Sequence, residues 1–259
     1  MNLEHKRKLR EIELNRALPF IQQGSKILEI GAGAGWQAIV FSDKGFDIEA
    51  IDVQESGYAK TAVFRVQFYD GKTIPYPDQH FDVVFSSNVL QHIPHMKVFQ
   101  AEIKRVLKPG GIAVHILPSG SWRFWTALSY YPNMFKKLGK LFQSNNNKPA
   151  EVDERSSQVL AHKLKNRSVP IRLFRAMYPK RLGEHGNVFS ELFLFSKTGW
   201  KGFFENTDWK LDHCKNSQLF YTGYQLLGKR LGLKTRKVLS NILGSSCSIF
   251  VLSKHQKVN

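Results

Sequence analysis

In KILEIGAGAG, at residues 26–35, a short and mostly apolar segment is followed by Gly31, Gly33 and Gly35. The apolar part predicts a buried strand, and residues 36–44 predict the helix that follows it. A strand that ends in glycines before a helix lets the backbone turn tightly. It also lets a ligand approach the backbone N–H groups at the positive end of the helix dipole. The stretch therefore predicts a nucleotide-type ligand site.

The spacing of the glycines narrows the choice of ligand. A dinucleotide-binding loop follows the pattern GxGxxG, whereas here Trp36 follows Gly35, so that the third glycine comes one residue early. This spacing disfavours a nicotinamide-dependent dehydrogenase. Taken alone, GxGxG also occurs in purely structural turns. The next predicted strand, at 47–53, supports a ligand site, because Asp52 near its end can accept hydrogen bonds from both hydroxyls of a ribose.

Strand-like and helix-like segments alternate over the first half of the chain. Apolar residues at helical spacing predict a helix that ends near Gly24, and residues 95–107 predict another, stopped by KPGG at 108–111. Such alternation predicts a doubly wound α/β fold with a mostly parallel sheet and right-handed crossovers. The four strands predicted in this half lie at 26–30, 47–53, 81–86 and 112–117.

The pattern changes after Pro118. Residues 118–190 contain 13 Lys plus Arg against 4 Asp plus Glu, with aromatic clusters and several prolines, and they predict a basic, largely helical lid inserted over the edge of the sheet. We therefore divide the chain into 1–117, the lid at 118–190, and 191–259 as the rest of the core. This last part is predicted to hold a helix at 191–206, strands at 209–220 and 247–253, and a basic helical insert at 219–245.

Composition limits the class of protein and its surroundings. With 38 Lys plus Arg against 21 Asp plus Glu, the formal charge of +17 favours anionic partners, the alternative being a merely solubilising surface. The two cysteines, Cys214 and Cys247, form no CxxC pair, which favours a reducing compartment and predicts no metal site. No signal peptide or apolar run of membrane-spanning length is found, so a cytoplasmic location is expected.

Three motifs in order give the chain a family resemblance. The glycine stretch is followed by DGKTIPY at 70–76, by Phe81 and Asp82, and by LKPGG at 107–111. Over about residues 25–117 this series resembles the class I S-adenosylmethionine-dependent methyltransferases. The resemblance implies S-adenosylmethionine as cofactor. It also implies a Rossmann-like sheet of seven strands with an antiparallel last strand, for which 247–253 is the candidate.

The resemblance also implies which residues meet the cofactor. Glu29 would orient the glycine loop near the cofactor's amino group, and Asn88 would lie beside its methionine part. Asp70 would meet the adenine, although an Asp before a glycine can equally serve to form a turn. Asp82 is expected to be structural. The full set of cofactor-binding positions implied is Glu29, Gly31, Ala32, Gly33, Gly35, Asp52, Val53, Asp70, Gly71 and Asn88.

The methyl acceptor is predicted less directly. Transfer to oxygen needs in-line approach and a base that removes a proton, and two histidines are candidates for this base. His92 follows the strand at 81–86, where a structural histidine is an equal alternative. His185 lies in RLGEHGN beside Glu184, in a glycine-flanked loop that suits an acceptor site better.

The lid favours an anionic acceptor. Its segment at 121–142 combines aromatic and basic residues, which predicts a cover over the cofactor site or, alternatively, contact with an anionic membrane. We expect O-methylation of an anionic or carrier-linked small molecule or glycan precursor, because the chain also looks loosely like bacterial methyltransferases of envelope-glycan pathways. The alternatives are an RNA methyltransferase, although no RNA-binding signature is found, and a non-catalytic cofactor-binding accessory protein.

Overall fold

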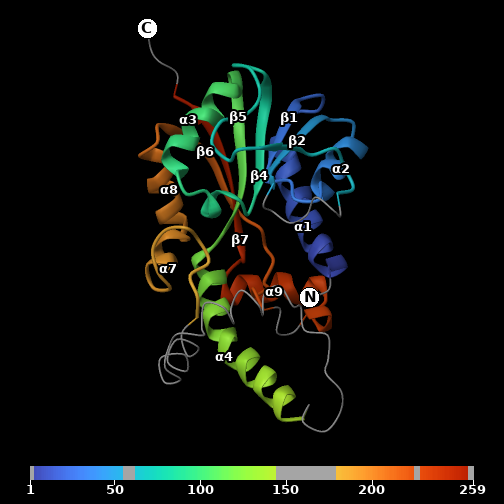
Figure 1. The fold of residues 1–259 in the computed structure, drawn as a ribbon, viewed down its shortest axis with the longest axis vertical. Coiled ribbons are helices and arrows are strands. Elements are labelled where there is room, and N and C mark those ends of the chain that lie inside the picture. The colour runs from blue at the N-terminus through green and yellow to red at the C-terminus, as the bar shows by residue number, and fades with distance from the viewer. Residues whose placement is uncertain (1–2, 55–61, 144–178, 225–227, 256–259) are drawn as a thin grey trace.

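The computed structural model describes residues 3–54, 62–143, 179–224 and 228–255. Its centre is a seven-stranded sheet in the order β3-β2-β1-β4-β5-β7-β6, drawn in Figure 1. Neighbouring strands are parallel from β3 to β5, whereas β7 is antiparallel to both β5 and β6. The strands are β1 (Lys26–Ile30), β2 (Asp47–Val53), β3 (Gln67–Tyr69), β4 (Phe81–Ser87), β5 (Leu107–Pro118), β6 (Trp209–Asn216) and β7 (Cys247–Lys254).

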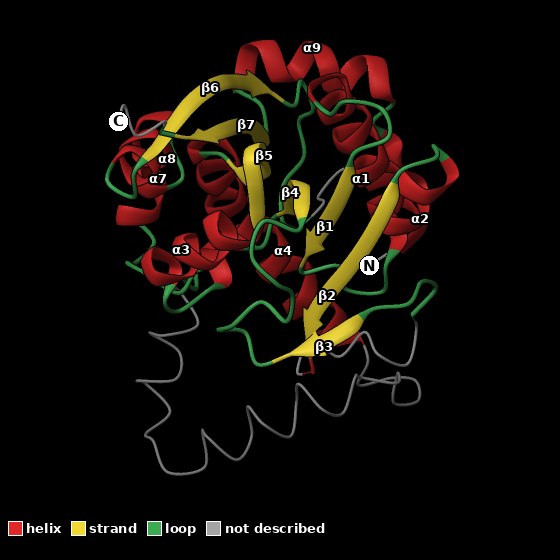
Figure 2. Ribbon diagram, turned by 90° about the horizontal axis from the view of Figure 1, so that it is seen from above, coloured by secondary structure: helices red, strands yellow, loops and turns green. Residues whose placement is uncertain are grey.

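Helices cover both faces of the sheet, as the view in Figure 2 shows. On one face α1 and α2 bury Leu14 and Phe41 against the strands, and on the other α3 and α8 bury Phe99 and Phe204. Each helix buries one apolar stripe, so the sheet lies between two apolar cores. The described helices are α1 (Leu3–Ala17), α2 (Trp36–Asp43), α3 (Met96–Val106), α4 (Gly120–Gln143), α7 (Ser190–Leu194), α8 (Lys197–Glu205) and α9 (Leu233–Leu243).

The predicted α/β fold is confirmed. Both β1 and β2 have the predicted bounds. The predicted antiparallel last strand is β7, which lies between β5 and β6. Because β5 leads into α4, the carboxyl ends of the parallel strands face the part of the molecule that holds α4 and α9 (Figure 1).

Several predicted elements differ from the structure. The strand expected to begin at residue 112 begins at Leu107, because Leu107 already pairs with Phe81 before the register shifts. The helix predicted over 191–206 is two helices, since the hydroxyl of Ser196 accepts a hydrogen bond from the Gly199 N–H and starts α8 anew. The strand predicted over 209–220 ends at Asn216, with the irregular middle that was expected. Strand β3, only three residues long, was not predicted.

The lid begins with a long helix. Helix α4 opens the predicted insertion, whereas residues 144–178, with the polar run SNNNKP, lie outside the described residues. The sequence also predicts a short helix or loop around 55–64, and residues 55–61 of it lie outside the described residues. In the insert predicted at 219–245, the structure shows a short 3-10 helix, Gly228–Arg230, and α9. None of the described helices is long and apolar enough to span a membrane.

Candidate active site

The glycine loop lies at the carboxyl ends of the parallel strands. It is fixed to the neighbouring strand, because the N–H groups of Gly31 and Ala32 donate to the carbonyl oxygen of Ile51 at 2.8 and 3.1 Å. Gly35 has a φ of +81°, and a Cβ added there would lie 2.5 Å from the Cβ of Phe64. A side chain at position 35 would therefore be strained twice over, in its backbone and in its contacts. In open α/β sheets this edge is where ligands bind.

Asp52 connects the second strand to the glycine loop. Its carboxylate accepts hydrogen bonds from the N–H of Gly33 at 2.8 Å and from the N–H of Val53 at 2.7 Å. The side chain is nearly buried. The structure thus brings together Asp52, Val53 and the loop, as the sequence predicted. The contact of Asp52 with a ribose stays a prediction.

Glu29 provides a test of whether the loop suits the implied cofactor. The side chain is buried in β1, and its Oε2 has no hydrogen-bond partner among the described residues. Burial and, to a smaller extent, the charge of Asp52 raise the pKa of Glu29 to about 8, although the hydrogen bond from the backbone N–H of Ala38 opposes the shift. A cationic group would stabilise the charged carboxylate. S-adenosylmethionine carries an ammonium and a sulfonium, so this site fits that cofactor.

Asp70 has the turn-forming role that the sequence left open. Its carboxylate accepts hydrogen bonds from the backbone N–H groups of Lys72 and Thr73, each at 2.8 Å, and these bonds lower its pKa. The side chain is exposed beyond the end of β3. Gly71, with a φ of +75°, packs beside Val53, whose Cγ1 lies 3.1 Å from where a Cβ would be. The expected adenine-binding residues are thus adjacent to the end of β2.

Asn88 follows β4 and lies across the sheet from Asp52. It has a left-handed φ of +58°, a conformation that asparagine tolerates better than most residues. Its N–H donates to the carbonyl oxygen of Ile116 at 2.8 Å, which holds the loop against β5. The next residue, Val89, fills the space where Gly31 would carry a side chain. Strained residues of this kind collect at ligand sites.

The two candidate bases lie on loops that touch. The N–H of Glu184 donates to the carbonyl oxygen of Gln91 at 2.8 Å, so the loop of His185 is held beside His92. Partial burial lowers the pKa of His92, although Glu184 opposes the shift. His185 is exposed and lines a small pocket of about 60 Å³. The structure thus places both histidines near the loop after β4.

A buried ion pair that the sequence did not predict holds the His185 loop. Arg123 of α4 donates to Glu191 of α7 at 2.6 Å, and both side chains are excluded from solvent. The other oxygen of Glu191 accepts hydrogen bonds from the N–H groups of Leu182 and Gly183, both at 2.7 Å. We expected Arg123 as one of the lid's basic residues only. Its partner lies 68 residues away, and no local spacing indicates such a pair.

The basic face of α1 was also missed. The guanidinium of Arg7 lies 3.0 Å from the ring centroid of Trp36, the residue that follows the glycine loop. Lys6, Arg7 and Arg10 line a cleft of about 370 Å³ together with Ala32 and other residues of the glycine loop. The helical spacing of these cations could be seen in the sequence, but the residues that they face could not be predicted from it.

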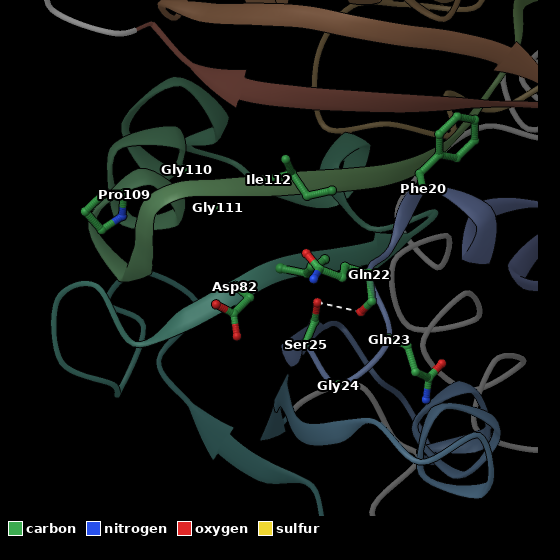
Figure 3. A pocket seen from close by; sticks show the side chains of 11 residues that line it. Phe20, Gln22, Gln23, Gly24, Ser25, Asp82, Pro109, Gly110, Gly111 and Ile112 are labelled. Atoms are coloured by element: carbon green, nitrogen blue, oxygen red, sulfur yellow. Dashed lines mark hydrogen bonds between the residues drawn. The ribbon is translucent and has the colours of Figure 1, made fainter.

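A pocket of about 450 Å³ lies at the opposite edge of the sheet (Figure 3). It is lined by Ser25, by Gly110 and by Asp82, where the strands begin rather than end. The carboxylate of Asp82 accepts hydrogen bonds from the backbone N–H of Lys26 at 2.9 Å and from the Lys108 ammonium at 2.8 Å. Asp82 therefore joins three strands, in agreement with the structural role expected for it. This pocket is not at the ligand-binding edge.

Comparisons with known proteins agree with this geometry. A family model described as a methyltransferase domain matches residues 3–212. The chain is 34% identical over 107 residues to a 2-methyl-6-phytyl-1,4-hydroquinone methyltransferase from Synechocystis, a match that covers 38% of this chain and 33% of that protein. It is 31% identical over 114 residues to a ubiquinone/menaquinone biosynthesis C-methyltransferase from Cupriavidus necator, covering 40% of this chain and 47% of that protein.

The fold has solved relatives over nearly its whole length. A SAM-dependent methyltransferase structure from Archaeoglobus fulgidus superposes with a TM-score of 0.53 and 15% identity, covering 96% of this chain and 94% of the other. At this identity the likeness concerns the fold alone. The curated relatives, in contrast, are matched over only a third to a half of their own length.

Proposed function

This chain belongs to the methyltransferase-domain family and has S-adenosylmethionine as its cofactor, and we propose that it methylates an oxygen of an anionic or carrier-linked small molecule or glycan precursor. The observation that carries the proposal is the arrangement at the ends of β1 and β2. There the carboxyl of Glu29, whose Oε2 has no hydrogen-bond partner among the described residues, lies with the carboxylate of Asp52 and the glycine loop. This is a site for a cationic nucleoside.

Each residue has a task in this proposal. S-adenosylmethionine supplies an electrophilic methyl group on a sulfonium. Asp52 accepts hydrogen bonds from the ribose, and Glu29 faces the ammonium. For an oxygen acceptor, the imidazole of His185 or His92 would take the hydroxyl proton as the oxygen–methyl bond forms and the methyl–sulfur bond breaks, with S-adenosylhomocysteine as the leaving group. Burial lowers the pKa of His92 and so favours the neutral ring, which is the form that can accept a proton.

The donor site is tested by replacing Asp52. In Asp52→Ala the ribose hydroxyls lose a charged acceptor, and the affinity for S-adenosylhomocysteine, measured by calorimetry, should fall more than about tenfold. A matched control is Asp47→Ala, which changes an exposed carboxylate at the opposite end of the same strand. Circular dichroism would show that both variants fold. If Asp52→Ala binds as the parent does, the ribose assignment is wrong.

A second candidate acceptor is a carbon of a phenolic ring. It is favoured by the names of the relatives, one of which is a C-methyltransferase and another a hydroquinone methyltransferase. The two chemistries are separated by incubating the protein with labelled cofactor and a panel of phenols with and without a carboxylate or phosphate. In the product, carbon NMR distinguishes a methoxy carbon from a ring methyl. A ring methyl would replace the O-methylation proposal.

RNA remains the alternative macromolecular acceptor, and the formal charge of +17 is the observation that favours it. Binding to RNA would weaken steeply as salt rises, because Lys and Arg release counterions from the phosphates. Methylation of small phenols that persists at high salt, with no transfer to total RNA, would support the small-molecule proposal.

A further inference from the structure

A small pocket lies between α1, the start of α4 and the segment that follows β6. It has a volume of about 160 Å³ and is distinct from the cleft over the glycine loop, although Lys6 and Arg10 line both. We call it the donor-lined pocket, because most of the side chains around it carry hydrogen-bond donors. The lining residues used in the argument below are Lys6, Arg10, Trp122, Tyr221, Thr222 and Gly223.

Two of the lining residues have buried polar atoms without a partner. Neither the indole Nε1 of Trp122 nor the hydroxyl Oγ1 of Thr222 makes a hydrogen bond within the described residues. Gly223 packs against α4, since a Cβ there would lie 2.8 Å from the Cγ2 of Thr126 and 3.5 Å from the Cζ2 of Trp122. Buried polar groups are paired in nearly all native structures, and an unpaired one is costly. Two in one pocket indicate a missing ligand.

The charge of the pocket indicates the sign of that ligand. Lys6 and Arg10 lie one helical turn apart and repel each other. The guanidinium of Arg10 is paired with the buried carboxylate of Glu13 at 2.7 Å. Glu4 and Glu11 are further carboxylates on this helix, and Glu11 lines the neighbouring cleft. An ammonium beside an indole N–H and a hydroxyl suits an oxyanion.

The pocket is connected to the cofactor site by a chain of polar contacts. Arg10 donates to the hydroxyl of Tyr221 at 3.2 Å, and that hydroxyl lies 3.1 Å from the sulfur of Cys247. The sulfur of Cys247 in turn donates to the Oδ1 of Asn88 at 3.6 Å. Asn88 is the residue expected beside the methionine part of the cofactor. A molecule held in the pocket is therefore near the place where the methyl group is transferred.

We propose that the donor-lined pocket binds a carboxylate or phosphate of the methyl acceptor, held by the Lys6 ammonium, the Trp122 indole N–H and the Thr222 hydroxyl. This inference rests on the proposed function, because it names the part of the same site that selects the acceptor. The pocket positions the acceptor and takes no part in the chemistry. A rival occupant with the same chemistry is the carboxylate of the cofactor itself.

The test uses the full chain saturated with S-adenosylhomocysteine. Phenyl phosphate, benzoate and uncharged phenol are titrated by calorimetry into the parent, into Lys6→Met and into Thr222→Val. The control is Lys8→Met, which removes an exposed charge from the same helix outside the pocket. We expect phenyl phosphate or benzoate to bind and phenol not to bind. Each pocket variant should weaken that binding about tenfold, and the control by less than about twofold. Thermal melts check that the variants fold.

Three results would overturn the inference. Anion binding could be the same in the pocket variants as in the parent, phenol could bind as well as the anions, or no probe could bind at all. A titration with S-adenosylhomocysteine alone distinguishes the acceptor from the rival occupant. If Lys6→Met also lost affinity for S-adenosylhomocysteine, the pocket would be assigned to the cofactor's carboxylate. A parent that does not bind S-adenosylhomocysteine would refute the proposed function instead.

Discussion

Replacing Glu29 by glutamine should change how stability depends on pH. The folded chain holds the Glu29 proton until about pH 8, whereas the unfolded chain releases it near its ordinary pKa of 4.5. Between these values unfolding releases a proton, so the free energy of unfolding falls as pH rises. Glu29→Gln carries no such proton and loses this dependence. Relative to the parent, the variant should therefore gain stability as pH rises.

The size of the effect follows from the two pKa values. Raising the pH from about 5 to about 9 should increase the stability of Glu29→Gln relative to the parent by about 4 kcal/mol. Urea unfolding at both pH values measures it, provided that unfolding is two-state. The control is Glu205→Gln, because Glu205 is exposed at the end of α8. The stability of this variant relative to the parent should be the same at both pH values.

One result would refute this reasoning. If the stability difference between Glu29→Gln and the parent were the same at both pH values, Glu29 would ionise normally in the folded chain. The carboxylate of Glu29 would then need no cationic cofactor to stabilise it. If the prediction holds, S-adenosylhomocysteine binding near neutral pH should also release a proton, seen as a binding heat that depends on the buffer.

Three further changes test the site and its supports. Glu191→Ala leaves the buried charge of Arg123 without its carboxylate and should lower the free energy of unfolding by about 3–5 kcal/mol in urea, so unchanged stability would contradict the buried pair. Gly35→Ala forces a positive φ on alanine and a contact with Phe64; it should weaken S-adenosylhomocysteine binding at least about tenfold, and parental affinity would contradict this. His185→Ala should slow O-methylation at least about 100-fold without changing cofactor affinity, and equal turnover would exclude it as the base.

Much of the fold could be predicted because local patterns determine it. Strands β1 and β2 are short segments rich in isoleucine with glycines close to their ends, and α3 has one apolar face. Strand β3 was missed because three residues with little burial carry no periodicity. The break between α7 and α8 was missed because Ser196 interrupts a run that is apolar on both sides, and a single N-cap is a weak signal there.

The site was predictable where it follows strand ends and not elsewhere. Glu29 and Asp52 end neighbouring parallel strands, so the topology alone brings them together. The donor-lined pocket brings together Lys6, Trp122 and Thr222. More than a hundred residues separate Lys6 from Trp122 in the sequence, and Thr222 is a hundred residues further along the chain. Such contacts depend on how the helices pack over the sheet edge, and the spacing of residues in the sequence does not predict that packing.

The most direct test of the central claim is a calorimetric titration of the protein with S-adenosylhomocysteine and, separately, with NADH. We expect S-adenosylhomocysteine to bind and NADH not to bind, because the glycines follow GxGxG and a cation would stabilise the charged form of the buried Glu29 carboxyl. Binding of NADH alone, or of neither compound, would contradict the assignment of the glycine loop as a methyl-donor site.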